Sequence, residues 1–144
     1  MKNCRRSNGH FVFHNTNPKG YVTQGDCVTR ALAVALGIDW KDVVAEQCSV
    51  AIDTGYGLLW KDNFERVLEH HGFAKKPMPR HADRTLYTVE EYIKEMNKTD
   101  NQNPIVLSLT HHLTTIKRVR GKFKIHDTWD CGNKTVRQVY VKEA

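Results

Sequence analysis

Cys27 stands where the sequence predicts the first turn of a helix, directly after Thr23-Gln24-Gly25-Asp26. Asp26 is expected to cap that helix. In its first turn, the unpaired backbone N–H groups and the positive end of the helix dipole favour a thiolate over a thiol. A lowered thiol pKa would make Cys27 a nucleophile. The alternative is that Cys27 is a small buried hydrophobe, and this stretch taken alone favours that interpretation.

A histidine and an aspartate are predicted to meet in the hairpin formed by residues 112–127. With a loop centred on residues 119–120, residue 112 pairs with residue 127. Directly opposed side chains have Cβ atoms about 5 Å apart, so we expect a hydrogen bond between His112 and Asp127 on the apolar face. The carboxylate would orient the imidazole and stabilise its charged form. The alternatives are a self-satisfied polar pair in the core, or a one-residue slip that offers His111 instead.

Helices are predicted in the first two thirds of the chain from apolar residues at helical spacing and from end signals. Asp39 is expected to cap the second helix, and Trp60 to face inward from the third, which Gly72 ends. Thr88-Val89-Glu90-Glu91 reads as a capping box for the fourth. The expected ranges are about Cys27 to Leu36, Trp40 to Cys48, Trp60 to His71 and Thr88 to Asn97.

Period-two patterns predict strands after these helices. A short strand at residues 11–13 lies in an N-terminal arm, and residues 74–87 are expected to form an exposed connection. The later strands, most simply antiparallel neighbours, are expected at residues 105–109, 112–119, 122–128 and 135–141. Helices followed by a sheet indicate an α+β class. At 144 residues the chain fits a single domain, residues 1–144.

The composition narrows the class of protein. With 22 Lys and Arg against 16 Asp and Glu, the net charge is +6. This charge could steer the protein to nucleic acid or an acidic partner, although a solvated basic face explains it equally and is preferred. No apolar run approaches the ~20 residues that span a bilayer, and no signal peptide is recognisable. We therefore expect a cytoplasmic protein with no membrane partner.

The cysteines form no C-x-x-C pair, which favours reduced thiols over disulfides and argues against structural zinc. We expect no cofactor and no metal. The four cysteines are Cys4, Cys27, Cys48 and Cys131.

The order Gly25-Asp26-Cys27, then His112, then Asp127 resembles the papain-like cysteine peptidase superfamily, in particular the compact bacterial branch that includes leader peptidases of bacteriocin exporters. Asn17-Pro18-Lys19-Gly20, the stretch at residues 25–31 and His126-Asp127-Thr128-Trp129-Asp130 also resemble a group of small uncharacterised bacterial and phage proteins. The resemblance implies a papain-like fold, with the nucleophile helix packed on a C-terminal antiparallel sheet. It also implies a peptide or protein substrate, a Cys27 thiolate, His112 as general base and acid, Asp127 as its orienter, and an acyl-enzyme intermediate.

Two departures from that pattern concern the site. The position six residues before the cysteine, where papain-like enzymes carry an oxyanion-binding glutamine, is Tyr21. Gln24 and Asn17 are the substitute candidates, beside the backbone N–H of Cys27. Thr128-Trp129 replaces the proline of the exporter peptidases, and Asp130 is the reserve candidate for orienting the histidine.

Two other functions remain open. Transglutaminase-like domains share the Cys, His, Asp order, so acyl transfer to an amine stands beside hydrolysis. The other alternative is a non-catalytic binding module, in which the basic surface would hold nucleic acid; its aromatic residues are sparse for base stacking. Specificity is expected in the loops at residues 49–59 and 74–87.

Overall fold

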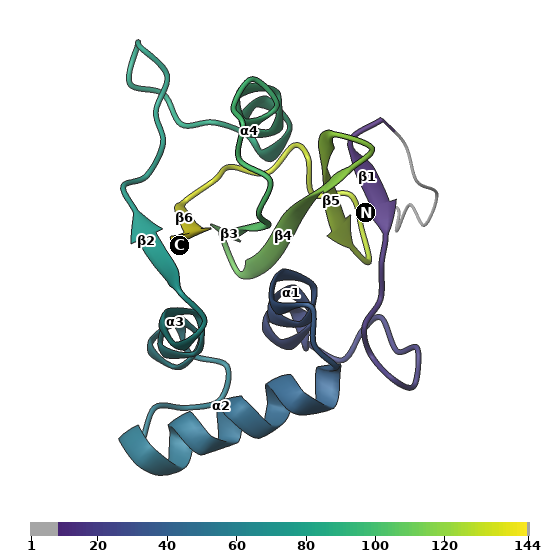
Figure 1. The fold of residues 1–144 in the computed structure, drawn as a ribbon, viewed down its shortest axis with the longest axis vertical. Helices are drawn as coiled ribbons and strands as arrows, with labels where there is room; N and C mark the ends of the chain where they lie inside the picture. The colour runs from purple at the N-terminus through teal and green to yellow at the C-terminus, as the bar shows by residue number, and fades with distance from the viewer. Residues whose placement is uncertain (1–8, 144) are drawn as a thin grey trace.

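The computed structural model describes residues 9–143, which form a six-stranded sheet with strand order β1-β5-β4-β3-β6-β2 (Figure 1). Neighbouring strands are antiparallel except β1 and β5, which are parallel. The α+β class is confirmed, and the four strands expected after residue 104 are antiparallel neighbours. The whole sheet is mixed, because the short strand of the N-terminal arm, β1, joins it parallel to β5. The strands are β1 (Phe11–Phe13), β2 (Phe73–Lys76), β3 (Ile105–Leu109), β4 (His112–Val119), β5 (Lys122–Asp127) and β6 (Gln138–Lys142).

Four helices in the described part of the chain cover the two faces of this sheet. Three pack on one face and α4 packs on the other (Figure 1). Alternation along β3 explains the division, because Val106 faces the first group whereas Ile105 and Leu107 face α4. Within residues 9–143, no helix combines the length and apolar character needed to cross a membrane. The helices are α1 (Cys27–Leu36), α2 (Trp40–Thr54), α3 (Lys61–His70) and α4 (Val89–Met96).

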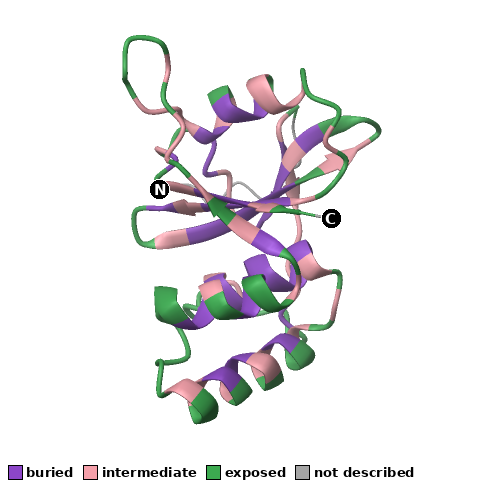
Figure 2. Ribbon diagram, turned by 60° about the vertical axis from the view of Figure 1, so that its left-hand side comes forward, coloured by how far each residue is buried: buried purple, intermediate pink, exposed green. Residues whose placement is uncertain are grey.

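The most buried helix is α1, which lies between the sheet and the outer helix α2 (Figures 1 and 2). Its residues 28–35 are all buried, whereas α2 buries only Val43, Gln47 and Val50 along one stripe. The Thr115 hydroxyl of β4 donates to the Ala31 carbonyl oxygen at 2.7 Å. This bond holds α1, which begins at Cys27, against β4, which begins at His112.

One of the predicted helix N-terminal caps is present, and two are not. The capping box of Thr88 and Glu91 is present. Asp26 and Asp39 stand at the N-cap positions of α1 and α2, but neither side chain caps its helix. Trp60 was expected to face inward and is instead 72% exposed, because it precedes α3 rather than lying within it.

The segment at residues 74–87 was expected to be only an exposed connection, but it begins with part of β2. This strand pairs with β6 at the sheet edge. Phe73 is its one buried residue, so the strand carries little apolar alternation. An edge strand of four residues with two adjacent lysines gives too weak a period-two signal to be recognised.

The hairpin of β4 and β5 has a different register from the predicted one. Val119 pairs with Lys122, so the loop is Arg120-Gly121, with φ angles of 53° and 84°. Two consecutive positive φ angles are typical of a type I′ hairpin turn. The pairing of Thr115 with His126 places Thr114, not His112, opposite Asp127. Because the error is two residues, side chains keep their predicted faces.

Half-buried His14 and buried His126 form a pair that joins the N-terminal arm to β5. The Nδ1 atoms of His14 and His126 lie 3.2 Å apart. Burial, followed by the charges of His14 and Lys117, lowers the pKa of His126 to about 4, and burial with Lys117 also lowers the pKa of His14. Both rings are therefore neutral at pH 7.

This pair predicts a loss of stability in acid. An unfolded histidine has a pKa of about 6.5, so below that pH the unfolded chain binds more protons than the folded one. Stability should fall as the pH drops from about 6.5 towards 4. Melting curves at pH 7 and pH 5 should show a smaller acid loss for His126→Gln than for the natural protein, and an unchanged loss for His70→Gln, an exposed control. Equal losses in all three proteins would contradict the prediction.

Candidate functional site

Cys27 is the first residue of α1 and is half-buried. Its backbone N–H is one of the amide groups that a helix leaves without an intrahelical acceptor. Cys27 lines one cavity together with His112 and Leu113, and hydrogen bonding to these two residues lowers the pKa of its thiol. The start of α1 and the start of β4 therefore meet at this thiol.

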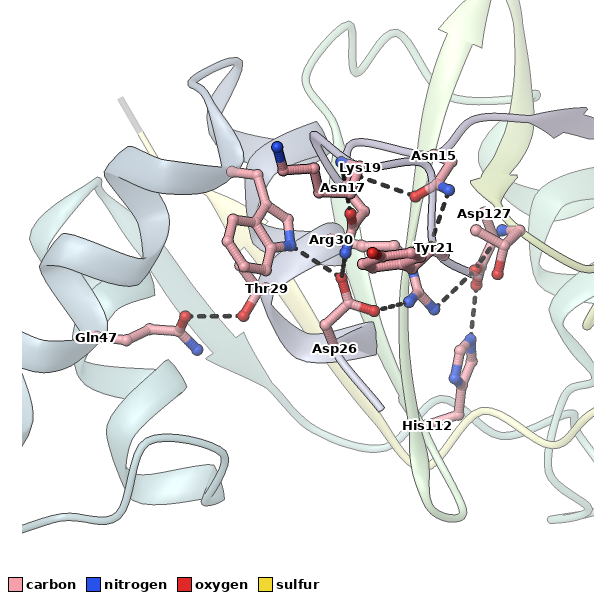
Figure 3. A network of polar contacts seen from close by, with 12 residues as sticks. Asn15, Asn17, Lys19, Tyr21, Asp26, Thr29, Arg30, Gln47, His112 and Asp127 are labelled. Carbon is pink, nitrogen blue, oxygen red and sulfur yellow. Dashed lines mark hydrogen bonds and ion pairs between the residues drawn. The ribbon is translucent and has the colours of Figure 1, made fainter. Parts of the chain in front are cut away.

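Asp127 holds the other side of the imidazole. His112 Nε2 lies 2.6 Å from Asp127 Oδ2 (Figure 3). The same oxygen accepts a hydrogen bond from the Thr114 hydroxyl at 2.7 Å. Asp127 Oδ1 accepts from the Thr128 backbone N–H at 2.6 Å. The Trp129 ring packs against the imidazole with 4.8 Å between ring centroids. The predicted contact between His112 and Asp127 is confirmed, as a diagonal pair rather than a directly opposed one.

These contacts favour opposite charges on the imidazole and the thiol. Burial lowers the pKa of His112, but hydrogen bonds with Asp127 and both neighbouring thiols outweigh it and raise the pKa to about 11. Burial raises the pKa of Cys27, yet its hydrogen bonds and the positive charges of His112 and Arg30 lower it overall. The arrangement can hold a thiolate beside an imidazolium, which is the form that attacks a carbonyl carbon.

A second thiol, that of Cys131, lies on the inner side of the imidazole. It is fully buried, and burial raises its pKa. One ligand atom from each of His112, Asp127 and Cys131 lies within 4.8 Å of the other two, and Cys27 is outside this cluster. Zinc ligands about 2.0–2.3 Å from the ion stand more than about 3 Å apart. The 2.6 Å between His112 and Asp127 is therefore a hydrogen-bond geometry, and a metal at these three residues would require it to open.

A buried charge network supports Asp127 from the α1 side. Arg30 forms an ion pair with Asp26, and its Nη2 atom lies 3.9 Å from Asp127 Oδ1 (Figure 3). Asp26 Oδ2 also accepts hydrogen bonds from Asn17 Nδ2 at 3.0 Å and Trp40 Nε1 at 2.9 Å. Asp26 thus stabilises Arg30 instead of capping α1.

The reserve candidates for site roles have other contacts. Asn17 donates its amide to Asp26, so it is committed to the charge network rather than to an oxyanion. Gln24 is exposed in the loop before α1. Asp130 contacts His10, whose Nε2 lies 2.9 Å from Asp130 Oδ2, and not His112. Cys4, the remaining cysteine of the N-terminal segment, lies outside the described residues.

A cavity of about 470 Å³ opens on both Cys27 and His112. Its apolar wall includes Leu59 and Trp60, which are 56% and 72% exposed. Both residues lie between α2 and α3, and Leu59 belongs to the segment 49–59 that was expected to be a specificity loop. That expectation is wrong for residues 49–54, which continue α2. The cavity therefore offers an apolar surface directly beside the thiol.

Sequence reasoning missed four residues around His112 and Asp127. Thr114 follows His112 by two residues, so strand alternation could have placed it on the same face. Arg30 was detectable as a charged residue in an apolar helix, four residues after Asp26. Trp129 and Cys131 follow β5 in an irregular loop, where no periodicity predicts which side chains turn inward.

No family model, curated protein or solved structure matches this chain. The resemblance to papain-like peptidases thus remains a prediction from the residues themselves. Functional inference rests on the geometry of Cys27, His112 and Asp127 within the α+β fold.

Proposed function

We propose that this protein is a cysteine-dependent amide hydrolase of papain-like type, most simply a peptidase, that acts through a Cys27 acyl-enzyme. The single observation that carries the proposal is that His112, which lines one cavity together with Cys27, has its Nε2 2.6 Å from Asp127 Oδ2. A nucleophile, a base and an orienting carboxylate in this order have the three roles that covalent acyl transfer needs.

In the proposed reaction, the Cys27 thiolate attacks the substrate carbonyl carbon and a C–S bond forms. Free amide groups at the start of α1 face the negative charge that develops on the oxygen. His112 then gives its proton to the leaving nitrogen, the C–N bond breaks, and a thioester remains on Cys27. Finally, His112 accepts a proton from water, whose oxygen attacks the thioester carbonyl carbon. The C–S bond breaks, which releases the acid and restores the Cys27 thiolate beside protonated His112. Attack by an amine in place of water would give the transglutaminase-like alternative.

Cys27 is proposed as the nucleophile in preference to Cys131. The lowered pKa of Cys27 and its position on an open cavity suit attack on a substrate. Cys131 is fully buried and its pKa is raised, so it is a poor nucleophile despite its contact with His112.

Alkylation by iodoacetamide tests the proposal without knowledge of the substrate. Because the thiolate is the reacting form, Cys27 should be labelled well below the pKa of about 8.5 of a free thiol. Labelling across pH 5–9 is followed by intact mass and peptide mapping, with half-buried Cys48 as an internal reference. His112→Gln should move the labelling of Cys27 to higher pH, and Cys131→Ala should leave it at low pH. Labelling of Cys27 only above about pH 8.5 would refute the proposal.

A further inference from the structure

A second cavity, of about 510 Å³, also lies against the His111-His112 segment. Both cavities are lined by these two histidines, but only the first is lined by Cys27. Thr110 and His111 form the two-residue loop between β3 and β4, and the φ angle of His111 is 57°. His111 lines both cavities, whereas Thr110 lines only the second. The second cavity is also lined by Trp129, Asn133, Lys134 and Arg137.

The two cavities differ in the number of cationic side chains that line them. No Asp or Glu lines either cavity, but Lys134 and Arg137 both line the second, whereas Lys61 is the one Lys or Arg that lines the first. Both residues are exposed, and neither forms an ion pair with any residue in the described range 9–143. Two cations without acidic partners make this cavity a site for an anionic group. The first cavity instead presents apolar side chains such as Leu59, Trp60 and Leu113.

The proposed reaction assigns one part of the substrate to each cavity. The acyl group bonds to Cys27, so it must occupy the cavity that Cys27 lines. The leaving amine receives its proton from His112, and the chain beyond that amine continues past the imidazole, towards Trp129 and the basic cavity. The lining supports this assignment, because Cys27 lines only the first cavity, Trp129 lines only the second, and His112 lines both.

We propose that the substrate is a peptide with an apolar side chain on the acyl side of the cleaved bond and a carboxylate on the leaving side, held by Lys134 and Arg137. This inference rests on the proposed function and specifies its substrate class. Guanidinium and ammonium groups are the side chains that recognise carboxylates. The carboxylate belongs to an Asp or Glu residue, or to the end of a short leaving peptide.

A set of synthetic peptides tests this assignment. Each peptide carries Leu or Phe on the acyl side and Glu, Ala or Lys at the first two leaving-side positions. Cleavage is measured by mass spectrometry, and binding by protection of Cys27 from iodoacetamide. Glu peptides should exceed Lys peptides by about tenfold in kcat/KM and in protection, as expected for two partly exposed charge contacts. High salt should reduce the difference.

Charge reversal provides the matched comparison. The double variant Lys134→Glu, Arg137→Glu should reverse the preference so that Lys peptides are favoured. The double variant Lys94→Glu, Lys122→Glu makes the same change in net charge at exposed positions on α4 and at the hairpin tip. It should keep the preference for Glu.

The possible failures are distinguishable. If the peptides show no charge preference in cleavage or protection, or if the preference survives reversal at Lys134 and Arg137, the inference is wrong. The same holds if no peptide is cleaved or protects while Cys27 remains reactive at low pH. In each case the proposed function is tested separately, by the pH dependence of Cys27 alkylation.

Discussion

Replacing Asp127 by Asn should lower Cys27-dependent turnover by about 10²–10⁴-fold, the range expected when the carboxylate behind a catalytic imidazole is neutralised. Asp127 Oδ2 lies 2.6 Å from His112 Nε2 and is the main contact that raises the pKa of this histidine. An amide keeps the shape but does not stabilise the imidazolium. The neutral imidazole then no longer stabilises the Cys27 thiolate.

The alkylation profile distinguishes this positioning role from a purely structural one. In Asp127→Asn, iodoacetamide labelling of Cys27 should require a higher pH, while far-ultraviolet circular dichroism verifies folding. Asp130→Asn is the matched control, because Asp130 contacts His10 and not His112. If Asp127→Asn keeps the natural labelling profile and turnover, Asp127 does not orient the base.

Replacing Arg30 by Met should lower the free energy of unfolding by about 3–5 kcal/mol, as expected when one partner of a buried ion pair is removed. Arg30 and Asp26 have side chains that are 8% and 10% exposed, and Asp127 is 5% exposed. Met fills a similar volume, so the loss comes from two buried carboxylates left without their shared cation. Urea unfolding followed by circular dichroism measures the change.

Two comparisons separate charge from packing at Arg30. Adding Asp26→Asn to Arg30→Met should recover part of the stability, because it removes one of the unpaired carboxylates. Arg66→Met removes an arginine that pairs with Glu69 at the surface, at 3.8 Å. That change should stay below about 1 kcal/mol. Equal stability of Arg30→Met and the natural protein would show that the network makes no net contribution.

The helices and most strands were predictable because their signals are local. The range of α1 follows from its apolar stripe and from Gly37 as its end. Such patterns do not reveal which chain segments meet, and the parallel pairing of β1 with β5 depends on residues more than 100 positions apart. Similarly, Trp60 has the spacing of an inward residue, yet tertiary packing leaves it exposed.

The contact between His112 and Asp127 was predictable from the sequence, whereas the register of the β4–β5 hairpin was not. His112 and Asp127 were expected on one face, and an error of two residues preserves that face. The position of the turn was harder to predict, because Arg120 adopts a positive φ that arginine rarely favours. The role of Asp26 was also not predictable from local sequence. An aspartate before a helix usually caps it, but here its carboxylate forms an ion pair with buried Arg30, one turn later.

The separation of the site residues along the chain affects when a reactive thiol can exist. Cys27 is 100 residues from Asp127, and β5 must be in place before the imidazole is held. At a synthesis rate of about 5–20 residues per second, Cys27 precedes its partners by roughly 5–20 seconds. During that interval the nascent chain carries an ordinary thiol. The contacts with His112 and Leu113 that lower the pKa of the Cys27 thiol form only after β4 and β5 have been made.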